Sequence, residues 1–206
     1  MSLDKLIINN GLRLGIFAAL TTALIAGVHL LTADKIAHSE QQHLLESLNE
    51  LVPSEIYNNI LLEDIIAVQD TRYLHLTQTE TAYRARLNDQ NIAVILPVLA
   101  PDGYSGNIKL LVAIKEDGSL LGVRVISHKE TAGLGDAIEK TKSDWIDNFN
   151  GRSLQNTPLW KVKRDGGQFD QLTGATITPR AVVKAVHNAL LYYQQHQTTL
   201  FLPSRT

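Results

Sequence analysis

The stretch Asp170-Gln171-Leu172-Thr173-Gly174-Ala175-Thr176-Ile177-Thr178-Pro179 joins a pair of glycines, Gly166 and Gly167, to a helical pattern that runs from Pro179 to Gln195. Thr178 is predicted to cap this helix and Pro179 to take its first position, where a missing N–H group costs nothing. Gly174 and Ala175 leave the backbone accessible between the hydroxyls of Thr173 and Thr176. Unpaired N–H groups and the helix dipole stabilise an anion at such a place, so a phosphate group fits here. An ordinary capping loop explains the same spacing and stays open as an alternative.

The predicted helix carries one apolar stripe along its length. The residues of the stripe and the small residues beside it are Val182, Val186, Leu190 and Tyr193, with Ala181, Ala185 and Ala189. A helix of this kind packs its apolar side on a neighbouring sheet. The sequence before Asp170 supplies the candidate strands for that sheet.

Strand patterns dominate the middle of the chain. The candidate strands are 65–68, 72–76, 81–87, 92–99, 107–115 and 120–127, with a further short one at 160–163. The turn at Asp117-Gly118 predicts that the strands on either side form a hairpin. Two helical stretches, 136–142 and 143–149, follow the last strand of the series, and Gly151 is expected to end the second. Residues 59–206 are therefore predicted to form an α+β domain, an antiparallel sheet flanked by helices.

An apolar run precedes this domain. Residues 14–33 are about 20 residues without a formal charge, which as a helix would span about 30 Å, the thickness of a bilayer. A buried core helix and a cleaved signal peptide are the alternatives, but no small-x-small cleavage pattern follows the run. We predict an uncleaved transmembrane helix. The helical pattern continues beyond it as a stalk, residues 34–58, in which Pro53 ends the helix.

The charges that flank the apolar run predict its orientation. Lys5 and Arg13 precede it, whereas Asp34 and Lys35 follow it and offset one another. The positive-inside rule then places residues 1–13 in the cytoplasm and the main domain outside.

Composition narrows the classes of function. Hydrophobic residues make up 44% of the chain and charged residues 19%, which is enough for a sizeable core. The formal net charge of −2 argues against nucleic acid as a partner. The chain has no cysteine, which excludes disulfides, thiolate-bound metals and iron–sulfur clusters. Its histidines are scattered, and no metal site is predicted.

Four features of the sequence occur together. They are the membrane helix, Gly103-Tyr104-Ser105-Gly106 before a strand, His128-x-Glu130-Thr131-x-Gly133-Leu134-Gly135, and Asp170-x-x-Thr173-Gly174-Ala175-Thr176. The last resembles the flavinylation motif of proteins that carry FMN covalently, in which a transferase joins the flavin phosphate to the final hydroxyl. In length and order the whole chain resembles the G subunits of the Rnf, or Rsx, ion-translocating electron-transport complexes of bacterial inner membranes. Its C-terminal half is similar to the C subunit of the sodium-pumping NADH:quinone reductase. One departure is Ala132, where the family often has proline.

The resemblance implies a single-pass inner-membrane protein whose periplasmic domain relays electrons through FMN. One FMN per chain would be esterified to Thr176 as a phosphothreonine. By motif position the other cofactor-binding residues are Thr173, Gly174, Ala175, Glu130, Thr131, Leu134, Gly135 and Tyr104. The glycine loop is expected to donate N–H groups to the cofactor, with Leu134 as an apolar contact of its ring. The implied partners are the other subunits of the complex, a flavin transferase and inner-membrane lipid.

No side chain is predicted to act as an acid, a base or a nucleophile, because the redox chemistry belongs to the cofactor. The isolated chain is expected to have little turnover. Two other functions stay open, a membrane-anchored flavin-binding module that regulates a partner and an assembly subunit in which the threonine loop is an empty cap. Single residues also have plainer interpretations, with His128 and Glu130 as charges paired on a loop, Tyr104 as a core residue and Asp170 as a loop cap.

Overall fold

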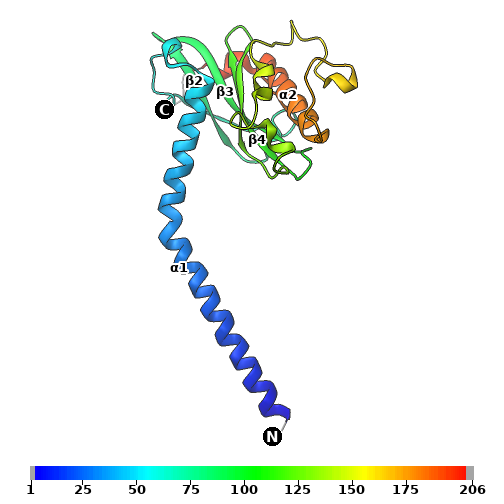
Figure 1. The fold of residues 1–206 in the computed structure, drawn as a ribbon. Helices are drawn as coiled ribbons and strands as arrows, with labels where there is room; N and C mark the ends of the chain where they lie inside the picture. The colour runs from blue at the N-terminus through cyan, green and yellow to red at the C-terminus, as the bar shows by residue number, and fades with distance from the viewer. Residues whose placement is uncertain (1–2, 203–206) are drawn as a thin grey trace. The chain divides into compact units, whose positions relative to one another are not determined.

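The computed structural model describes residues 3–202 and divides the chain into two compact units, Met1–Leu45 and Glu46–Thr206. Helix α1 (Leu3–Leu51) makes up the first unit and ends within the second (Figure 1). Its stretch Asn9–Ile36 is long and apolar enough to cross a membrane and includes the predicted span. The predicted end of the helix near Pro53 is confirmed, and the 3₁₀ turn η1 (Ser54–Ile56) follows it.

The second unit is built on an antiparallel sheet, as predicted, and the sheet has five strands. The strands follow one another in space as in the sequence: β1 (Ile65–Val68), β2 (Glu80–Leu87), β3 (Gln90–Ala100), β4 (Ile108–Lys115) and β5 (Leu120–Ser127). Asn88 and Asp89, both in the left-handed region, form the tight turn between β2 and β3. The predicted hairpin at Asp117-Gly118 is confirmed, because β4 and β5 are paired neighbours.

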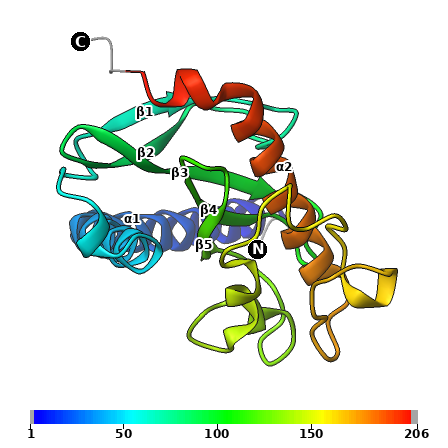
Figure 2. The same cartoon turned by 90° about the horizontal axis from the view of Figure 1, so that it is seen from above.

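Helix α2 (Ile177–Leu200) lies across one face of this sheet, where it contacts β3 and β4 (Figures 1 and 2). The predicted stripe faces the sheet, and its residues Val182, Val186, Leu190 and Tyr193 are at most 3% exposed. Burial of each such side chain contributes about 1.5–3 kcal/mol, so the stripe is what holds the helix on the sheet.

The opposite face of the sheet is buried as well. Ala93 and Ile95 in β3 alternate with the residues that face α2 and are fully buried. The end of α1 packs on this side, where Leu51 comes so close to β5 that a Cβ at Gly122 would lie 3.2 Å from Leu51 Cδ2. Burial on both faces explains why β3 is a continuous apolar run instead of an alternating pattern.

The predicted strand at 72–76 is wrong. The side chain of Asp70 accepts hydrogen bonds from the N–H groups of Tyr73 and Leu74, so a local turn satisfies donors that a strand would offer to a neighbour. His75 then adopts a left-handed conformation, with φ 55°. The segment is a loop.

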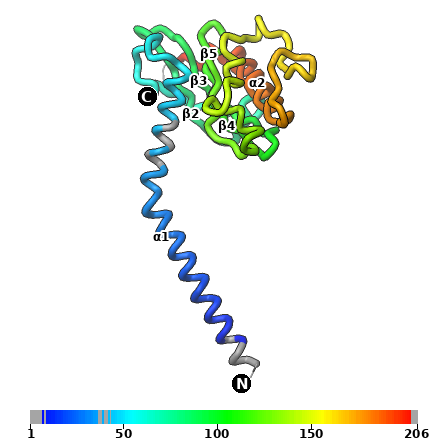
Figure 3. Tube along the Cα trace, viewed as in Figure 1, coloured from blue at the N-terminus to red at the C-terminus, as the bar shows by residue number. Residues whose placement is uncertain are grey.

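The connection from β5 to α2 also differs from the prediction. Figure 3 traces this connection along the side of α2. Within the described residues it contains three short 3₁₀ helices and no α-helix, namely η2 (Gly135–Ile138), η3 (Asp144–Phe149) and η4 (Lys163–Asp165). The α-helices predicted at 136–142 and 143–149 are therefore wrong in type. Glu139 is extended, and Ser143 caps η3 by accepting the N–H of Trp145 at 3.2 Å, which prevents one helix from continuing into the next. Gly151, at φ 72°, follows the end of η3 as expected.

The strand predicted at 160–163 is absent from the described structure. Val162 makes only an isolated bridge to Phe169. Trp160 instead packs its ring between Phe169 and His187, with ring centroids 5.1 and 5.5 Å apart. The bridge has two backbone hydrogen bonds, from Lys163 N–H to the Phe169 carbonyl at 2.7 Å and from Phe169 N–H to the Lys161 carbonyl at 3.2 Å, and together with the ring packing they hold the segment.

Helix α2 begins two residues earlier than predicted and extends past Gln195 to Leu200. The cap position belongs to Thr176, and its side chain makes no cap hydrogen bond. The prediction of Thr178 as the cap is wrong, because Thr178 is already helical and buried. Pro179 still falls in the first turn. The N–H groups of this turn have no acceptor within the helix, so proline costs no hydrogen bond here.

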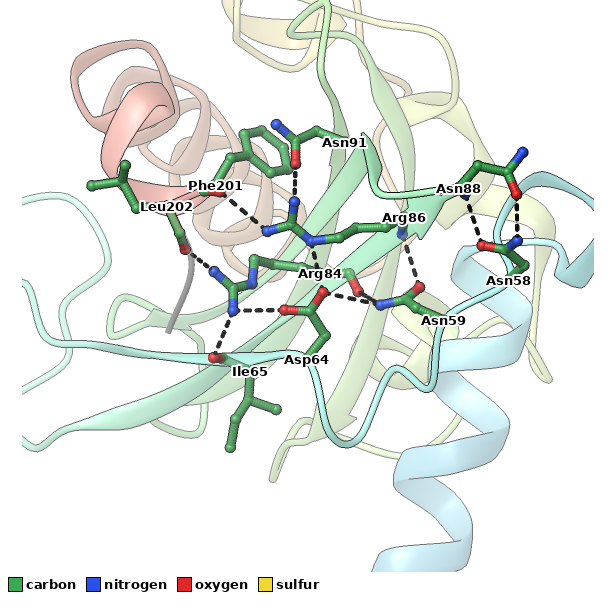
Figure 4. Close-up of polar contacts among 10 residues, drawn as sticks. All are labelled: Asn58, Asn59, Asp64, Ile65, Arg84, Arg86, Asn88, Asn91, Phe201 and Leu202. Carbon is green, nitrogen blue, oxygen red and sulfur yellow. Dashed lines mark hydrogen bonds and ion pairs between the residues drawn. The ribbon is translucent and has the colours of Figure 1, made fainter. Parts of the chain in front are cut away.

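A cluster of three charged residues, which we call the arginine clasp, joins the sheet to the C-terminal end of α2 (Figure 4). Asp64 accepts from Arg84 at 2.6 Å and from Arg86 at 2.7 Å. The same arginines donate to the carbonyls of Leu202 and Phe201, at 3.1 Å for Arg86 and Phe201. Phe201 and Leu202 directly follow the last helical residue, Leu200, so the clasp places two positive guanidinium groups at the negative end of the α2 dipole.

Candidate functional site

Three segments that are far apart in the sequence enclose a cavity of about 290 Å³ at the start of α2. They are the loop before β4, the loop after β5 and the turn that leads into α2. The first two meet because β4 and β5 are antiparallel neighbours, so the start of one lies beside the end of the other. The lining residues are Tyr104, Glu130, Thr131, Leu134, Gly135, Gly174, Ala175, Thr176, Ile177 and Thr178.

The turn before α2 requires the glycine at its centre. The N–H of Ala175 donates to the carbonyl of Leu172 at 3.3 Å, which closes a four-residue turn around Thr173 and Gly174. Gly174 has φ 80°, a value that favours glycine at this place in a turn. A Cβ there would also lie 2.7 Å from Leu134 Cδ2. The glycine therefore lets the turn approach the loop after β5.

Thr176 follows this turn directly, as the residue that caps α2. It is half-buried, lines the cavity and makes no side-chain cap hydrogen bond. The first N–H groups of a helix lack partners within it and carry the positive end of its dipole. A negatively charged group bonded to the Thr176 hydroxyl would therefore be stabilised by these N–H groups and by the helix dipole.

The cation nearest in sequence to this hydroxyl is engaged elsewhere. Arg180, in the first turn of α2, forms a two-fold ion pair with Asp165, with distances of 2.6 and 2.7 Å. The hydrogen bond from Arg180 holds the pKa of the Asp165 carboxyl below its usual range. Arg180 also donates to the Thr176 carbonyl at 3.3 Å. The arginine therefore fixes the turn and the helix start, and the helix dipole is the source of positive potential at the cavity.

The loop after β5 turns back on itself around one carbonyl. The Thr131 carbonyl accepts the N–H groups of Leu134, Gly135 and Asp136 at 3.2, 3.0 and 3.3 Å. The expectation that this loop offers its N–H groups to a cofactor is thus wrong for Leu134 and Gly135, because a tight turn uses them internally. The side chain of Leu134 does line the cavity and remains 43% exposed.

Glu130 is the one charged residue among the described lining residues, and it is buried, with 8% exposure. Its carboxylate accepts the N–H groups of Ser105 at 2.9 Å and Tyr104 at 3.3 Å, and the hydroxyl of Thr178. His128 instead pairs with Glu139, with 2.7 Å between His128 Nε2 and Glu139 Oε1. The interpretation of a residue paired with a nearby charge on a loop therefore fits His128 and not Glu130.

Tyr104 is not a core residue. Its side chain is 67% exposed and stands at the cavity together with Leu134 and Ile177, the latter 44% exposed. These three side chains form an apolar rim. Such a rim offers contact to a flat, apolar group that enters the cavity from solvent.

All predicted site residues except Thr173 line the cavity. Thr173 is exposed at the tip of the turn. Asp170 also lies away from the lining, where its carboxylate pairs with Lys163 at 2.5 Å and its carbonyl accepts the indole N–H of Trp145 at 2.6 Å. It anchors the base of the loop to η3.

Two lining residues, Ile177 and Thr178, were not predicted as part of the site. Ile177 follows Thr176 and carries no motif signal. Thr178 was predicted to be the helix cap. Its hydrogen bond to Glu130, which makes it part of the cavity wall, joins residues too far apart in the sequence to be inferred from it. Among residues 3–202, no group of three or more His, Cys, Asp or Glu side chains is placed to hold a metal ion.

Comparison with known proteins matches both units of the chain. A family model described as FMN-binding domain matches residues 103–191, which contain all the residues that line the cavity. A second, described as RnfG N-terminal region, matches residues 1–51, which correspond to α1.

Full-length relatives carry one shared description, that of the G subunit of an ion-translocating oxidoreductase complex. The chain is 48% identical over 200 residues to such a protein of Shewanella piezotolerans, covering 96% of this chain and 94% of that relative. Proteins of the same name from Shewanella oneidensis and Vibrio cholerae are 46% and 47% identical, over 94% and 93% of this chain and 92% of each relative.

Proposed function

The chain belongs to the family of G subunits of ion-translocating oxidoreductase complexes, and we propose that it carries FMN as an ester of the Thr176 hydroxyl. The family makes it an electron-transfer subunit of such a complex, with an FMN-binding domain. The ester linkage, its position and a stoichiometry of one FMN per chain are our proposal.

The placement of Thr176 supports this proposal most directly. Its hydroxyl has no cap bond to break, it lines the cavity, and it stands at the start of a helix of 24 residues. A phosphodiester keeps about one negative charge, which the N–H groups and dipole of a helix N-terminus stabilise. In forming the ester the hydroxyl loses its proton and its oxygen bonds to the flavin phosphorus, while the donor's leaving group departs from the same phosphorus.

The cavity fits such a group in kind and in size. Its volume of about 290 Å³ lies at the lower end of the range for ligand pockets, so it suits partial enclosure of a cofactor that stays open to other proteins. Gly174 and Ala175 leave room beside the phosphate, and the apolar rim of Tyr104, Leu134 and Ile177 suits a planar ring. A covalent bond would keep the cofactor at a site that encloses it only in part.

When bound, FMN supplies the electron transfer. The chain itself would hold, orient and shield the cofactor. Thr176 would tether the phosphate, the α2 N-terminus would balance its charge, and the apolar rim would shield the cofactor from water. No side chain of the site is assigned a proton-transfer role.

The first unit places this domain at a membrane. The apolar stretch of α1 and the membership of a membrane complex indicate a single-pass protein of the bacterial inner membrane. We further propose that residues 1–13 are cytoplasmic, 14–33 span the bilayer, 34–58 form the stalk, and 59–206 form a periplasmic domain, because Lys5 and Arg13 precede the span. Besides the other subunits of the complex, the proposed partners are a flavin transferase and membrane lipid.

Intact mass measurement tests the ester. The full chain, produced with an active flavin transferase, is expected to gain the mass of one FMN less one water and to fluoresce in a denaturing gel. Thr176→Ala should lose both signals, and Thr176→Ser, which keeps the hydroxyl, should retain them. Thr199→Ala, which removes an exposed hydroxyl elsewhere on α2, is the matched control and should load fully. An unmodified wild-type chain would overturn the ester and favour a regulatory or assembly role.

A further inference from the structure

Glu130 is a buried carboxylate held entirely by protein donors. With 8% exposure, it accepts two backbone N–H groups and the Thr178 hydroxyl, and within the described residues it takes part in no ion pair. A buried charge is costly unless it is hydrogen-bonded. The two N–H groups and the hydroxyl supply these bonds, so the Glu130 carboxylate is satisfied within the protein at the cavity wall.

The same carboxylate connects the three segments that build the site. Its donors lie in the loop before β4 and in the first turn of α2, and Glu130 itself lies in the loop after β5. The surroundings are tightly packed. A Cβ at Gly135 would lie 2.9 Å from Glu130 Cβ and 3.1 Å from Thr178 Oγ1, and a Cβ at Gly103 would lie 3.0 Å from Glu130 Oε1. The carboxylate has little room to move away from the cavity.

A histidine fixes the backbone of Glu130 as well. The N–H of Glu130 donates to His128 Nδ1 at 3.0 Å, and His128 Nε2 lies 2.7 Å from Glu139 Oε1. With Nδ1 accepting, the proton of the neutral ring is on Nε2 and points to Glu139. Both the main chain and the side chain of Glu130 are therefore held.

We propose that Glu130 is a positioning residue that holds a fixed negative charge beside the flavin and lowers its reduction potential. The inference rests on the proposed binding of FMN in this cavity. A cofactor that gains negative charge on reduction is harder to reduce next to a like charge, and the effect is strong where water is excluded. The nearest guanidinium at the helix start, that of Arg180, is paired with Asp165 and does not offset it.

The midpoint potential of the flavin tests this proposal. The full chain is loaded by a flavin transferase, purified in detergent and titrated spectroscopically at about pH 8, well above the ordinary pKa of a carboxyl. Glu130→Gln, which removes the charge and keeps the shape, should shift the potential to a more positive value. Glu116→Gln removes one charge from an exposed glutamate outside the site and should leave the potential unchanged. Glu130→Asp keeps the charge, so it should restore a potential close to that of the wild type even if the shorter side chain lowers stability.

A second variant covers the case in which Glu130→Gln fails to fold. Thr178→Val removes one donor from the carboxylate and keeps the charge, so less of that charge is offset and the potential should move in the negative direction. A loaded Glu130→Gln chain with the wild-type potential, or a loaded Thr178→Val chain with a potential that rises or stays the same, would overturn the role of Glu130 and leave the proposed flavin site intact. A wild-type chain that acquires no FMN would overturn both.

Discussion

Removal of the Asp64 carboxylate should weaken the arginine clasp and loosen the C-terminal end of α2. The change is Asp64→Asn, which keeps the shape of the side chain and removes its charge. Asp64 accepts from both Arg84 and Arg86, and the Arg84 side chain is only 2% exposed. The variant leaves a buried guanidinium opposite an amide, while the carbonyls of Leu202 and Ile65 still accept from it (Figure 4).

The magnitude follows from the burial of the two partners. Removing one partner of a buried ion pair costs about 3–5 kcal/mol, and since the Asp64 side chain is 21% exposed we expect the lower end, about 3 kcal/mol. For a domain of this size, about 1 kcal/mol corresponds to about 2–4 °C in the unfolding temperature. The expected decrease in Tm is therefore about 6–12 °C.

Thermal unfolding of the full chain in detergent, followed by tryptophan fluorescence, measures this decrease. Asp102→Asn is the matched control, since Asp102 pairs with Lys184 at 2.5 Å but both side chains are more than half exposed. Exposed pairs contribute about 0–1 kcal/mol, so the control should lower Tm by no more than about 4 °C. Equal shifts in the two variants would refute the reasoning. A double variant, Asp64→Leu with Arg84→Met, should be less destabilised than the sum of its single changes, because both members of the Asp64–Arg84 pair are removed together and Arg86 keeps Asn91 and the Phe201 carbonyl as acceptors.

Three further changes test other parts of the domain. Gly174→Ala forces a left-handed alanine and places a Cβ 2.7 Å from the Leu134 side chain, so it should cost about 1–3 kcal/mol in thermal unfolding and reduce flavin loading measured by mass. Burial lowers the pKa of His187 below its ordinary value of 6.5, so the unfolded chain binds the proton first as the pH falls. Stability should therefore decrease below about pH 6.5, and His187→Gln should flatten the curve of Tm against pH between about pH 7.5 and 5. The Tyr193 hydroxyl donates to the Glu116 carbonyl at 3.0 Å, and burial raises the pKa of this phenol to about 12, so in the wild type it stays neutral across the ordinary pH range. Tyr193→Phe removes this hydrogen bond and should lower the free energy of unfolding, measured in urea, by about 1 kcal/mol.

Elements with a strong local signal could be predicted from the sequence. The turn at Asp117-Gly118 located the hairpin of β4 and β5, and the apolar stripe located α2 and the face that it buries. The lining of the candidate site, except for Ile177 and Thr178, was predicted through motif resemblance. The spacing of Thr173 to Thr176 by itself allowed an ordinary capping loop as well.

The errors arose where a distant partner or a side chain decides the local structure. Thr178 has the composition of a helix cap, but its hydroxyl bonds to Glu130, and the helix begins before it. Asp70 turns the predicted strand at 72–76 into a loop by accepting two N–H groups. The inward turn of the glycine loop around the Thr131 carbonyl could not be inferred from residue types, because the same glycines suit an outward-facing loop equally well.

Helix α2 is fixed at both of its ends, and this restricts how its length can change. It has 24 residues, or about 36 Å, with Thr178 bonded to Glu130 near one end and the arginine clasp at the other. Insertion of one residue in its middle would rotate everything beyond by about 100° and turn the apolar stripe away from the sheet. Even a whole-turn insertion, which nearly restores the stripe, would move the carbonyls of Phe201 and Leu202 about 5 Å beyond Arg84 and Arg86. The length of α2 is thus fixed by its contacts with the arginine clasp and with Glu130. Insertions and deletions should be tolerated more readily in the loops of the domain than in this helix.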